Sequence, residues 1–285
     1  MPLKKNPEKG GEALLDATDF LVVDVETTGL SAEGGDRVCE LGAVKLRGGA
    51  VVATLGSLID PQRPISAGAY AVNRISPAML AGAPPFSTIA PRLRELMEDS
   101  VLVAYNAPFD ASFLEMEFRL AGFPPIRNTI VDALAVARRL LPGLDRYPQH
   151  NVARVLGIPD QVKHRAQEDA LITATILTIF TSILKAYECP RLSDLMRPDI
   201  FQVLEERRMR IIAGALAAAR NVWIKYLSPA DNVMTDRIVT PKEIVGLARA
   251  QGTRSLIAYC HAERGDRNFR IDRILDLRLM EDRSF

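Results

Sequence analysis

The sequence predicts an α/β protein, in which a mixed sheet flanked by helices is followed by a smaller β-rich domain. Three observations lead to this fold class. Four apolar segments of strand length occur before residue 106, and amphipathic helical segments follow up to residue 187. From residue 221 onward, short apolar segments alternate with turn residues, which is typical of a small β unit.

The composition is that of an ordinary soluble protein. The chain has 285 residues, 48% hydrophobic and 25% charged, and this length favours two domains. We expect a flexible N-terminal tail over residues 1–18, no signal peptide and no membrane segment. Three scattered cysteines predict reduced thiols and a cytoplasmic location. Residues 1–185 hold 19 Lys/Arg and 21 Asp/Glu (net −2), and residues 186–285 hold 17 and 14 (net +3).

The first apolar segment, Phe20–Leu30 (FLVVDVETTGL), carries two acids that point to a metal site. Side chains alternate along a strand, so Asp24 and Glu26 project from the same face of the sheet. Like charges among apolar residues are costly unless a cation lies between them, and Mg²⁺ and Mn²⁺ prefer carboxylate oxygens. The alternative, two acids facing water at an exposed strand end, stays open for this segment alone.

The following elements are predicted in order from the apolar pattern. A hairpin joins strands at 37–46 and 51–59, and residues 60–90 form a loop with short helical pieces. The later elements of this domain are a helix that begins at Pro91, a strand at 101–105, and helices at 111–121, 129–141, 151–156 and 166–187.

The domain boundary is predicted at a Pro-rich break in composition. Residues 19–187 form the first domain, and residues 188–220 form a linker (Pro190–Pro198) and a helix (Asp199–Arg220). Residues 221–285 form the second domain. Its predicted elements are strands in NVWIKYL, DRIVTP, SLIAYCH and NFRIDRILDLRL, with one helical piece at Pro241–Ala250.

Two further acids and a histidine occur where strands end or helices begin. Asp110 follows the strand at 101–105, and His164 precedes Asp169 by five residues at the start of the longest helix. Taken singly, each acid is an ordinary first-turn residue and the histidine a solvated one. Together with Asp24 and Glu26, however, they can coordinate two divalent ions, with His164 as a base whose ordinary pKa is close to working pH.

These residues lie in three motifs that resemble those of the DEDDh (DnaQ-like) 3′→5′ exonucleases, which include polymerase proofreading subunits. The motifs are DVETTGL at 24–30, NAPFD at 106–110 and HRAQEDA at 164–170. The resemblance implies a ribonuclease-H-like fold and release of nucleoside 5′-monophosphates by two-metal hydrolysis. It also implies Mg²⁺ or Mn²⁺ bound by Asp24, Glu26, Asp110 and Asp169, with His164 as the general base.

The same resemblance implies residues that hold the terminal nucleotide. They follow the first motif (Thr27, Thr28, Leu30), lie in the segment Tyr70–Ser76 (Asn73), or belong to the second motif (Asn106, Phe109).

The C-terminal segment Arg254–Arg273 mixes arginines with aromatic residues, a pattern that suits single-stranded nucleic acid. The alternative is a solvated strand face on which these arginines pair with Asp266, Asp272 and Asp276. The order of features from 221 to 280 resembles a WYL domain, which implies an Sm-like β-barrel that binds nucleic acid or a nucleotide. The implied contacts are Tyr226, Arg237, Arg267, Arg270 and Arg273, with Trp223 in the core of the barrel.

The sequence therefore predicts a metal-dependent 3′→5′ exonuclease that acts on single strands or 3′ ends, with DNA favoured over RNA. The C-terminal domain is predicted to bind nucleic acid or a nucleotide effector. Two alternatives stay open: a nucleic-acid- or nucleotide-binding regulator with little catalysis, and a proofreading subunit that works on a polymerase.

Overall fold

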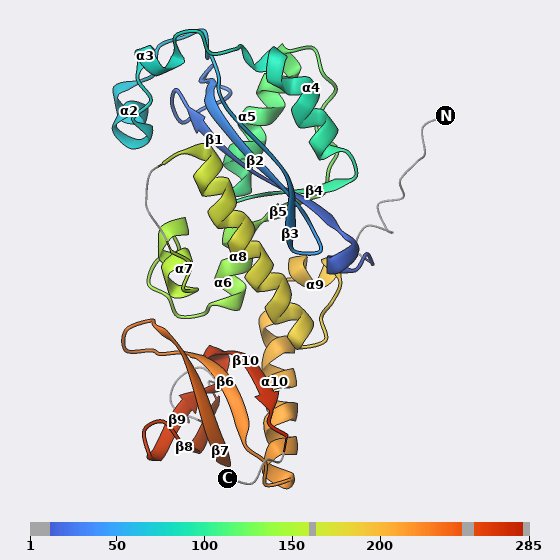
Figure 1. Ribbon diagram of the computed structural model, residues 1–285, viewed down its shortest axis with the longest axis vertical. Coiled ribbons are helices and arrows are strands. Elements are labelled where there is room, and N and C mark those ends of the chain that lie inside the picture. Colours follow the sequence, from blue (N-terminus) through green and yellow to red (C-terminus); the bar gives the residue numbers. More distant parts are fainter. Residues whose placement is uncertain (1–11, 160–163, 247–253, 282–285) are drawn as a thin grey trace.

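The computed structural model describes residues 12–159, 164–246 and 254–281. It contains two five-stranded sheets (Figure 1), connected by the long helices α8 (Ala166–Ala186) and α10 (Ile200–Ala217). Helices lie against the first sheet, and the second sheet lies beyond the C-terminal end of α8. The predicted α/β fold class is thereby confirmed.

The first sheet has the strand order β3-β2-β1-β4-β5 and is mixed, as the sequence predicts. Strand β1 pairs antiparallel with β2 and parallel with β4. Its central position places the acids of β1 in the middle of the sheet. The strands are β1 (Asp19–Thr27), β2 (Val38–Arg47), β3 (Ala50–Leu58), β4 (Ser100–Ala104) and β5 (Ile130–Asp132).

Alternation along β1 supplies the two hydrophobic cores of this sheet. Phe20 and Val22 pack with the core under α8, and Leu21 and Val23 pack with the core on the other face. The helices around the sheet are α2 (Ala67–Asn73), α3 (Pro77–Leu80), α4 (Phe86–Met97), α5 (Ala107–Leu120), α6 (Ala133–Leu140), α7 (Gln149–Val155) and α8.

Three predicted boundaries in this domain are wrong. Residues 130–132 form strand β5 rather than the start of a helix, because this short strand runs directly into the apolar pattern of α6. Helix α4 begins at Phe86 and contains Pro91 in its second turn. Helix α5 begins at Ala107, four residues before its predicted start, and its first turn contains Pro108, whose fixed φ suits that position.

Helix α8 crosses β1 and β2 and packs its apolar side chains into the core between them. By length and composition it is apolar enough to cross a membrane, yet its buried residues pack against the sheet and the neighbouring helices. Its first turn lies directly on β2 at Gly42: a Cβ atom there would lie closer than 3.0 Å to backbone atoms of Ala166 and Gln167. Glycine at this position therefore permits the close approach of helix and strand.

The second sheet is antiparallel, with the order β10-β6-β7-β8-β9. The three-residue helix η2 (Ile271–Arg273) carries the chain from one edge strand to the other, so the sheet must curl to bring its edges close. The elements are α9 (Leu192–Met196), α10, β6 (Val222–Leu227), β7 (Met234–Gly246), β8 (Arg254–Cys260), β9 (Gly265–Arg270) and β10 (Ile274–Leu279).

The helical piece predicted at Pro241–Ala250 is wrong. Residues 241–246 continue strand β7 and pair with β8, past a register shift between Pro241 and Glu243. Residues 247–250 lie outside the described residues. Proline favours a helix start, but here it lies at an irregularity of the ladder, where its missing N–H is tolerated.

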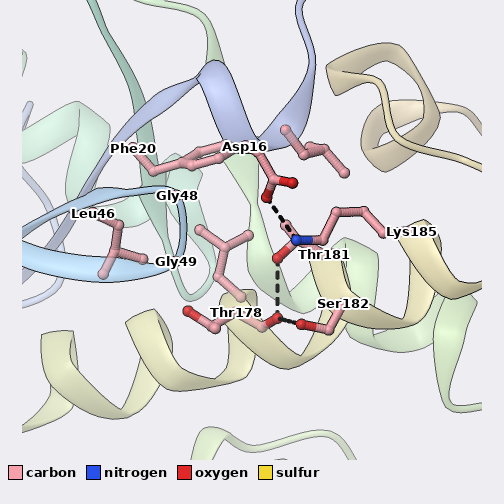
Figure 2. A pocket seen from close by; sticks show the side chains of 11 residues that line it. Asp16, Phe20, Leu46, Gly48, Gly49, Thr178, Thr181, Ser182 and Lys185 are labelled. Atoms are coloured by element: carbon pink, nitrogen blue, oxygen red, sulfur yellow. Dashed lines mark hydrogen bonds and ion pairs between the residues drawn. The ribbon is translucent and has the colours of Figure 1, made fainter.

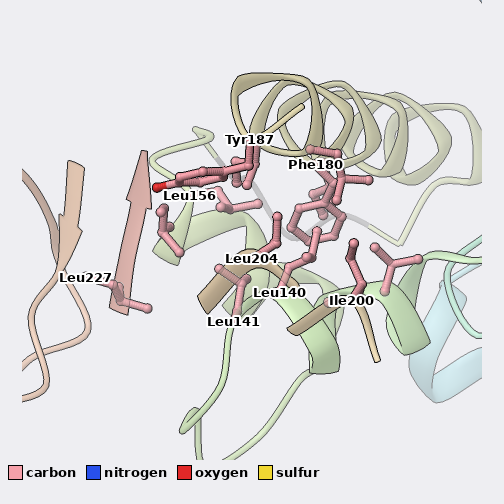
Figure 3. Close-up of a cluster of buried hydrophobic side chains, with 14 of the residues drawn as sticks. Leu140, Leu141, Leu156, Phe180, Tyr187, Ile200, Leu204 and Leu227 are labelled. Atoms are coloured by element: carbon pink, nitrogen blue, oxygen red, sulfur yellow. The ribbon is translucent and has the colours of Figure 1, made fainter. Parts of the chain in front are cut away.

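One hydrophobic core runs between the two sheets. Figure 3 shows Phe180 of α8, and Tyr187 directly after that helix, facing Ile200 and Leu204 of α10, with Leu227 of the second sheet nearby. The predicted tail also takes part in the fold. Residues 1–11 lie outside the described residues, but Leu15 is buried in helix η1 (Leu15–Ala17) and its N–H donates to Pro190 O at 2.7 Å.

Candidate active site

Strand β1 presents Asp24 and Glu26 on the face that α8 covers. Glu26 lies directly opposite Glu40 of β2 in the antiparallel register, so these two side chains share a face as well. The register shifts between Glu26 and Thr27, where the strand leaves the ladder. Three carboxylates thus gather at one end of two paired central strands.

Asp110 reaches the same strand from the first turn of α5. It is buried, and its Oδ1 accepts a hydrogen bond from Val25 N at 3.0 Å. The start of α5 is held in turn by Asp132, whose Oδ1 accepts from Asn106 N at 3.1 Å and from Ala107 N at 3.3 Å. The carboxylate of Asp110 is therefore held at the backbone N–H of Val25, the residue that lies between Asp24 and Glu26 in the strand.

Helix α8 brings Asp169 to this group from the other side. Ligand atoms of Glu26, His164 and Asp169 all lie within 4.8 Å of one another, with His164 exposed and the two acids half-buried. The chain turns at His164, which has a positive φ of 45°. Gln149 of α7 steadies the first turn of α8, since its Nε2 donates to Asp169 O at 2.8 Å.

The carboxylates of this site are buried close to one another, and the pKa values of Asp24, Glu26 and Asp110 are raised as a result. Burial and the neighbouring carboxylates Asp110 and Asp169 raise the pKa of Asp24 well above its ordinary value. Burial, then the charges of Asp169 and Glu40, raise the pKa of Glu26 to about 8. Burial raises the pKa of Asp110 to about 7, although its hydrogen bond from Val25 N acts in the opposite direction.

A divalent cation fits this set of donors. Carboxylate oxygens and an imidazole converge here, and the acids would ionise fully only beside positive charge. Arg165 is a cation that acts on Glu26, but its guanidinium is bound to Glu40. The donor set therefore suits a divalent metal ion in its chemistry.

The residues predicted to hold the terminal nucleotide divide into two groups. Thr28 and Asn73 are buried and bonded within the chain: Thr28 Oγ1 donates to Asp36 Oδ1 at 3.1 Å, and Asn73 Nδ2 donates to Thr27 O at 3.2 Å. A side-chain contact between Asn73 and a base does not fit this arrangement, because Asn73 Oδ1 also accepts from Ile75 N at 3.0 Å.

The other members of this set have different surroundings. Thr27 is buried and donates to Gly29 O at 2.6 Å, whereas Leu30 is 88% exposed. Asn106 is exposed, and Phe109 is half-buried with its ring 4.9 Å from that of Phe113. Leu30 and Asn106 are thus the two residues of the set whose side chains are open to solvent.

Two of the arginine and tyrosine contacts predicted for the second domain are buried instead. Tyr226 packs edge-on against Phe269. Arg273 ties the two domains together, because its Nη2 donates to Gly143 O at 2.8 Å and its Nη1 to Asn232 Oδ1 at 3.0 Å. Neither side chain is placed for contact with a nucleic acid.

The other predicted arginines of this domain pair with acids, and the Arg270–Asp272 pair is one that the alternative interpretation expected. Arg270 binds Asp272, and Arg237 and Arg267 both bind Glu263. Trp223 is half-exposed rather than in the core. The Lys225 ammonium lies 5.7 Å and the Arg278 guanidinium 5.1 Å from the centre of its ring.

Glu40, Asp132, Gln149 and Arg165 were not predicted from the sequence. Each acts through contacts across at least 20 residues, and such pairings leave no local pattern. For Glu40 a signal existed: an acid in an otherwise apolar strand, RVCELGAVKL, requires a partner if the strand is buried.

A separate cavity of about 140 Å³ lies along the C-terminal half of α8, away from the carboxylates. Figure 2 shows Lys185 and Asp16 joined across it, and the hydroxyls of Thr181 and Ser182 both donate to Thr178 O along the helix. Its polar groups are satisfied within the chain, so it adds nothing to the site at the other end of the helix.

A mixed sheet with two acids on its central strand, further acids on two flanking helices and a histidine beside them defines the DEDDh class of exonucleases. Residues 21–177, more than half of the chain, match the Exonuclease family, and residues 207–279 match the WYL domain family. The chain therefore belongs to the exonuclease family and carries a WYL domain.

Individual relatives agree with this assignment. The DNA polymerase III subunit epsilon of Treponema pallidum is 37% identical over 161 residues, which cover 56% of this chain and 74% of that subunit. A PolC-type DNA polymerase III of Thermotoga maritima is 35% identical over 249 residues. This match covers 83% of this chain but 18% of that polymerase.

Solved structures show the same fold. E. coli exonuclease I in complex with a dA16 oligonucleotide has a TM-score of 0.53 and 17% identity, over 85% of this chain and 55% of that chain. The nuclease domain of 3'hExo, a DEDDh family member bound to rAMP, has a TM-score of 0.51 and 15% identity, over 60% and 94%.

Proposed function

We propose that this protein is a metal-dependent 3′→5′ exonuclease that releases nucleoside 5′-monophosphates, with DNA as the favoured substrate. The observation that supports this most is the convergence of Asp24, Glu26, Asp110 and Asp169 with His164. These residues come from three separated segments, and packing alone does not require so many buried acids in one place.

Each residue has a distinct role in this proposal. Asp24, Glu26, Asp110 and Asp169 would hold two Mg²⁺ or Mn²⁺ ions, which when bound activate water and stabilise the departing 3′-oxygen. His164 is exposed at the mouth of the site and takes a proton from the attacking water at an imidazole nitrogen. Leu30 follows the strand that carries Asp24 and Glu26, Asn106 precedes the helix that carries Asp110, and both are exposed and would position the terminal nucleotide.

A degradation assay tests this function. We expect a 5′-labelled DNA oligonucleotide to shorten from its 3′ end in Mn²⁺ or Mg²⁺, and Asp24→Ala to abolish the reaction. The control Asp199→Ala removes an exposed acid that pairs with Arg197 far along the chain, and it should leave the rate unchanged. An RNA oligonucleotide of the same sequence measures the preference for DNA. Intact substrate in both metals, or equal rates for wild type and Asp24→Ala, would refute the proposal.

We also propose that the WYL domain binds nucleic acid through the face around Trp223 rather than through the buried residues Tyr226 and Arg273. This face shares Lys225 and Arg278 with a cavity of about 190 Å³ that α8, β6, β7 and β10 line. Both cations also pair with acids on the same face, Lys225 with Asp236 and Arg278 with Asp276. An aromatic ring flanked by cations suits the stacking of a base beside its phosphates. With Asp24→Ala as the background, Trp223→Ala should weaken salt-sensitive binding of a single strand about 10-fold.

Two other functions are candidates: a regulator that binds nucleic acid or a nucleotide without cleaving it, and a proofreading subunit that acts together with a polymerase. The relatives that are subunits or parts of DNA polymerase III favour the proofreading subunit. Co-elution of the purified chain with a replicative polymerase in fixed ratio would support it. Strand binding by the full chain with no product in either metal would support a regulator.

A further inference from the structure

Glu40 lies beside the proposed metal ligands, but its carboxylate binds Arg165. It stands opposite Glu26 on the neighbouring strand, and it is 5% exposed. Its Oε1 accepts from Arg165 Nη2 at 2.6 Å, and its Oε2 accepts from Arg165 Nε at 3.0 Å. The Oε2 atom also accepts from Ala166 N at 3.3 Å. The buried carboxylate of Glu40 thus binds the Arg165 guanidinium through both of its oxygens and accepts a backbone N–H as well.

These contacts join two parts of the site that are 125 residues apart in the sequence. Arg165 follows His164 directly, and Ala166 is the first residue of α8, whose first turn carries Asp169. The pair therefore ties the segment that holds His164 and Asp169 to the strand that lies next to Glu26. The glycine at 42, on the same strand, allows the helix to sit close enough for this contact.

We propose that Glu40 and Arg165 are positioning residues for the reaction. They set the place of His164 and Asp169 relative to Glu26, and they keep the Glu40 carboxylate out of the metal-binding group. The proposal rests on the proposed exonuclease function. Its physical basis is the bidentate geometry, which fixes both distance and orientation, whereas a single hydrogen bond fixes distance alone.

Loss of either partner has a different consequence. Without Arg165, Glu40 becomes an unpaired buried acid that faces Glu26 on the neighbouring strand, with no cation to balance its charge. Without the charge of Glu40, Arg165 is half-exposed and can turn to solvent, which releases the start of α8. Removal of both charges leaves no unpaired acid, so the double variant should be less impaired than the sum of the single variants.

The chain offers a matched control in Arg37 and Glu117. Arg37 Nε and Nη2 bind the two carboxylate oxygens of Glu117 at 2.7 and 2.8 Å, and Val38 N donates to Glu117 as well. This pair is also bidentate, half-buried and anchored next to β2, but it joins the strand to α5 on the other face of the sheet. It therefore reports the general effect of breaking such a pair without moving α8.

The test compares Glu40→Gln, Arg165→Gln, the double variant and Arg37→Gln. We expect Arg165→Gln to lower kcat for a single-stranded oligonucleotide by about 10- to 100-fold in saturating Mn²⁺, with KM within about 3-fold of wild type. Amide hydrogen exchange in the metal-free protein should accelerate about 10-fold for Ala166 and the first turn of α8. Arg37→Gln should lower the melting temperature by about as much as Arg165→Gln does. Its kcat and the exchange rate at the start of α8 should stay within about 2-fold of wild type.

Three results would overturn the proposal: unchanged kcat in Arg165→Gln, unchanged exchange at the start of α8, or an equal fall of kcat in Arg37→Gln. If Arg165→Gln does not fold, Arg165→Lys and Glu40→Gln provide the same comparison, because Lys keeps the charge but not the bidentate contact. If the wild type is inactive on every substrate, the proposed function fails, whereas the exchange measurement still decides whether this pair holds the start of α8.

Discussion

Gly42 allows a test of how closely the site depends on the approach of α8 to β2. In Gly42→Ala the new Cβ would lie closer than 3.0 Å to backbone atoms of Ala166 and Gln167, whereas ordinary contact begins at 3.4 Å. Backbone atoms cannot turn aside as a flexible side chain does. The start of α8 must therefore move outward by about 1 Å, a misplacement that can reduce catalysis about 100-fold.

The two effects of this substitution can be separated by measurement. Overpacking of this kind costs about 1–3 kcal/mol of folding free energy, so the variant should still fold. We expect urea unfolding to show this modest loss, and kcat on a DNA oligonucleotide to fall about 100-fold at a temperature where the variant is fully folded. Gly214→Ala is the control. Nothing lies within 4 Å of its Cβ position in α10, so it should gain about 0.5–1 kcal/mol and keep full activity. Full activity in Gly42→Ala would show that the position of α8 is not critical.

Three further predictions concern stability. Glu26 and Asp110 have raised pKa values in the folded protein, about 8 and about 7. The folded state therefore binds their protons more tightly than the unfolded chain, and the metal-free melting temperature should fall as the pH rises from 5 to 9; a flat profile, or no larger stabilisation by Mn²⁺ at high pH, would contradict this. Arg208 is 1% exposed and its Nε and Nη1 have no hydrogen-bond partner among the described residues, so Arg208→Met should be neutral or stabilising by about 1–4 kcal/mol in urea unfolding, and a clear loss would show that its charge is compensated. Asn73→Ala should cost about 1–3 kcal/mol by the same method yet leave KM nearly unchanged, whereas a large rise of KM would restore the predicted contact with the base.

The sequence was most informative where function places unusual residues at the ends of regular elements. Asp24 and Glu26 could be found because they interrupt an apolar strand, and Asp110 and Asp169 because they lie at helix starts within recognisable motifs; the structure brings the four together. Strand β5 could not be found, because its three residues continue into the pattern of α6. The strand at 241–246 was mistaken for a helix because Pro241 is a helix-start signal whose meaning here depends on a partner strand.

The individual contacts predicted for the C-terminal domain were misjudged for a different reason. Arginine is equally suited to a phosphate, a carboxylate or a carbonyl oxygen, and local sequence does not say which is nearby. Arg273 binds Gly143 O from the other domain, and Arg270 binds Asp272 two residues away. Trp223 was placed in the core because large aromatic side chains usually are, but the alternation of β6 turns it outward with Lys225.

The length of α8 has a consequence for the substrate. Its 21 residues span about 30 Å, so one rigid rod separates the acids at its first turn from the second sheet at its last. If both ends grip the same strand, that strand must extend over about nine nucleotides at the rise of B-form DNA. Digestion would then slow when the remaining oligonucleotide is too short to reach both ends of α8, so the length of the helix would set the length of the product.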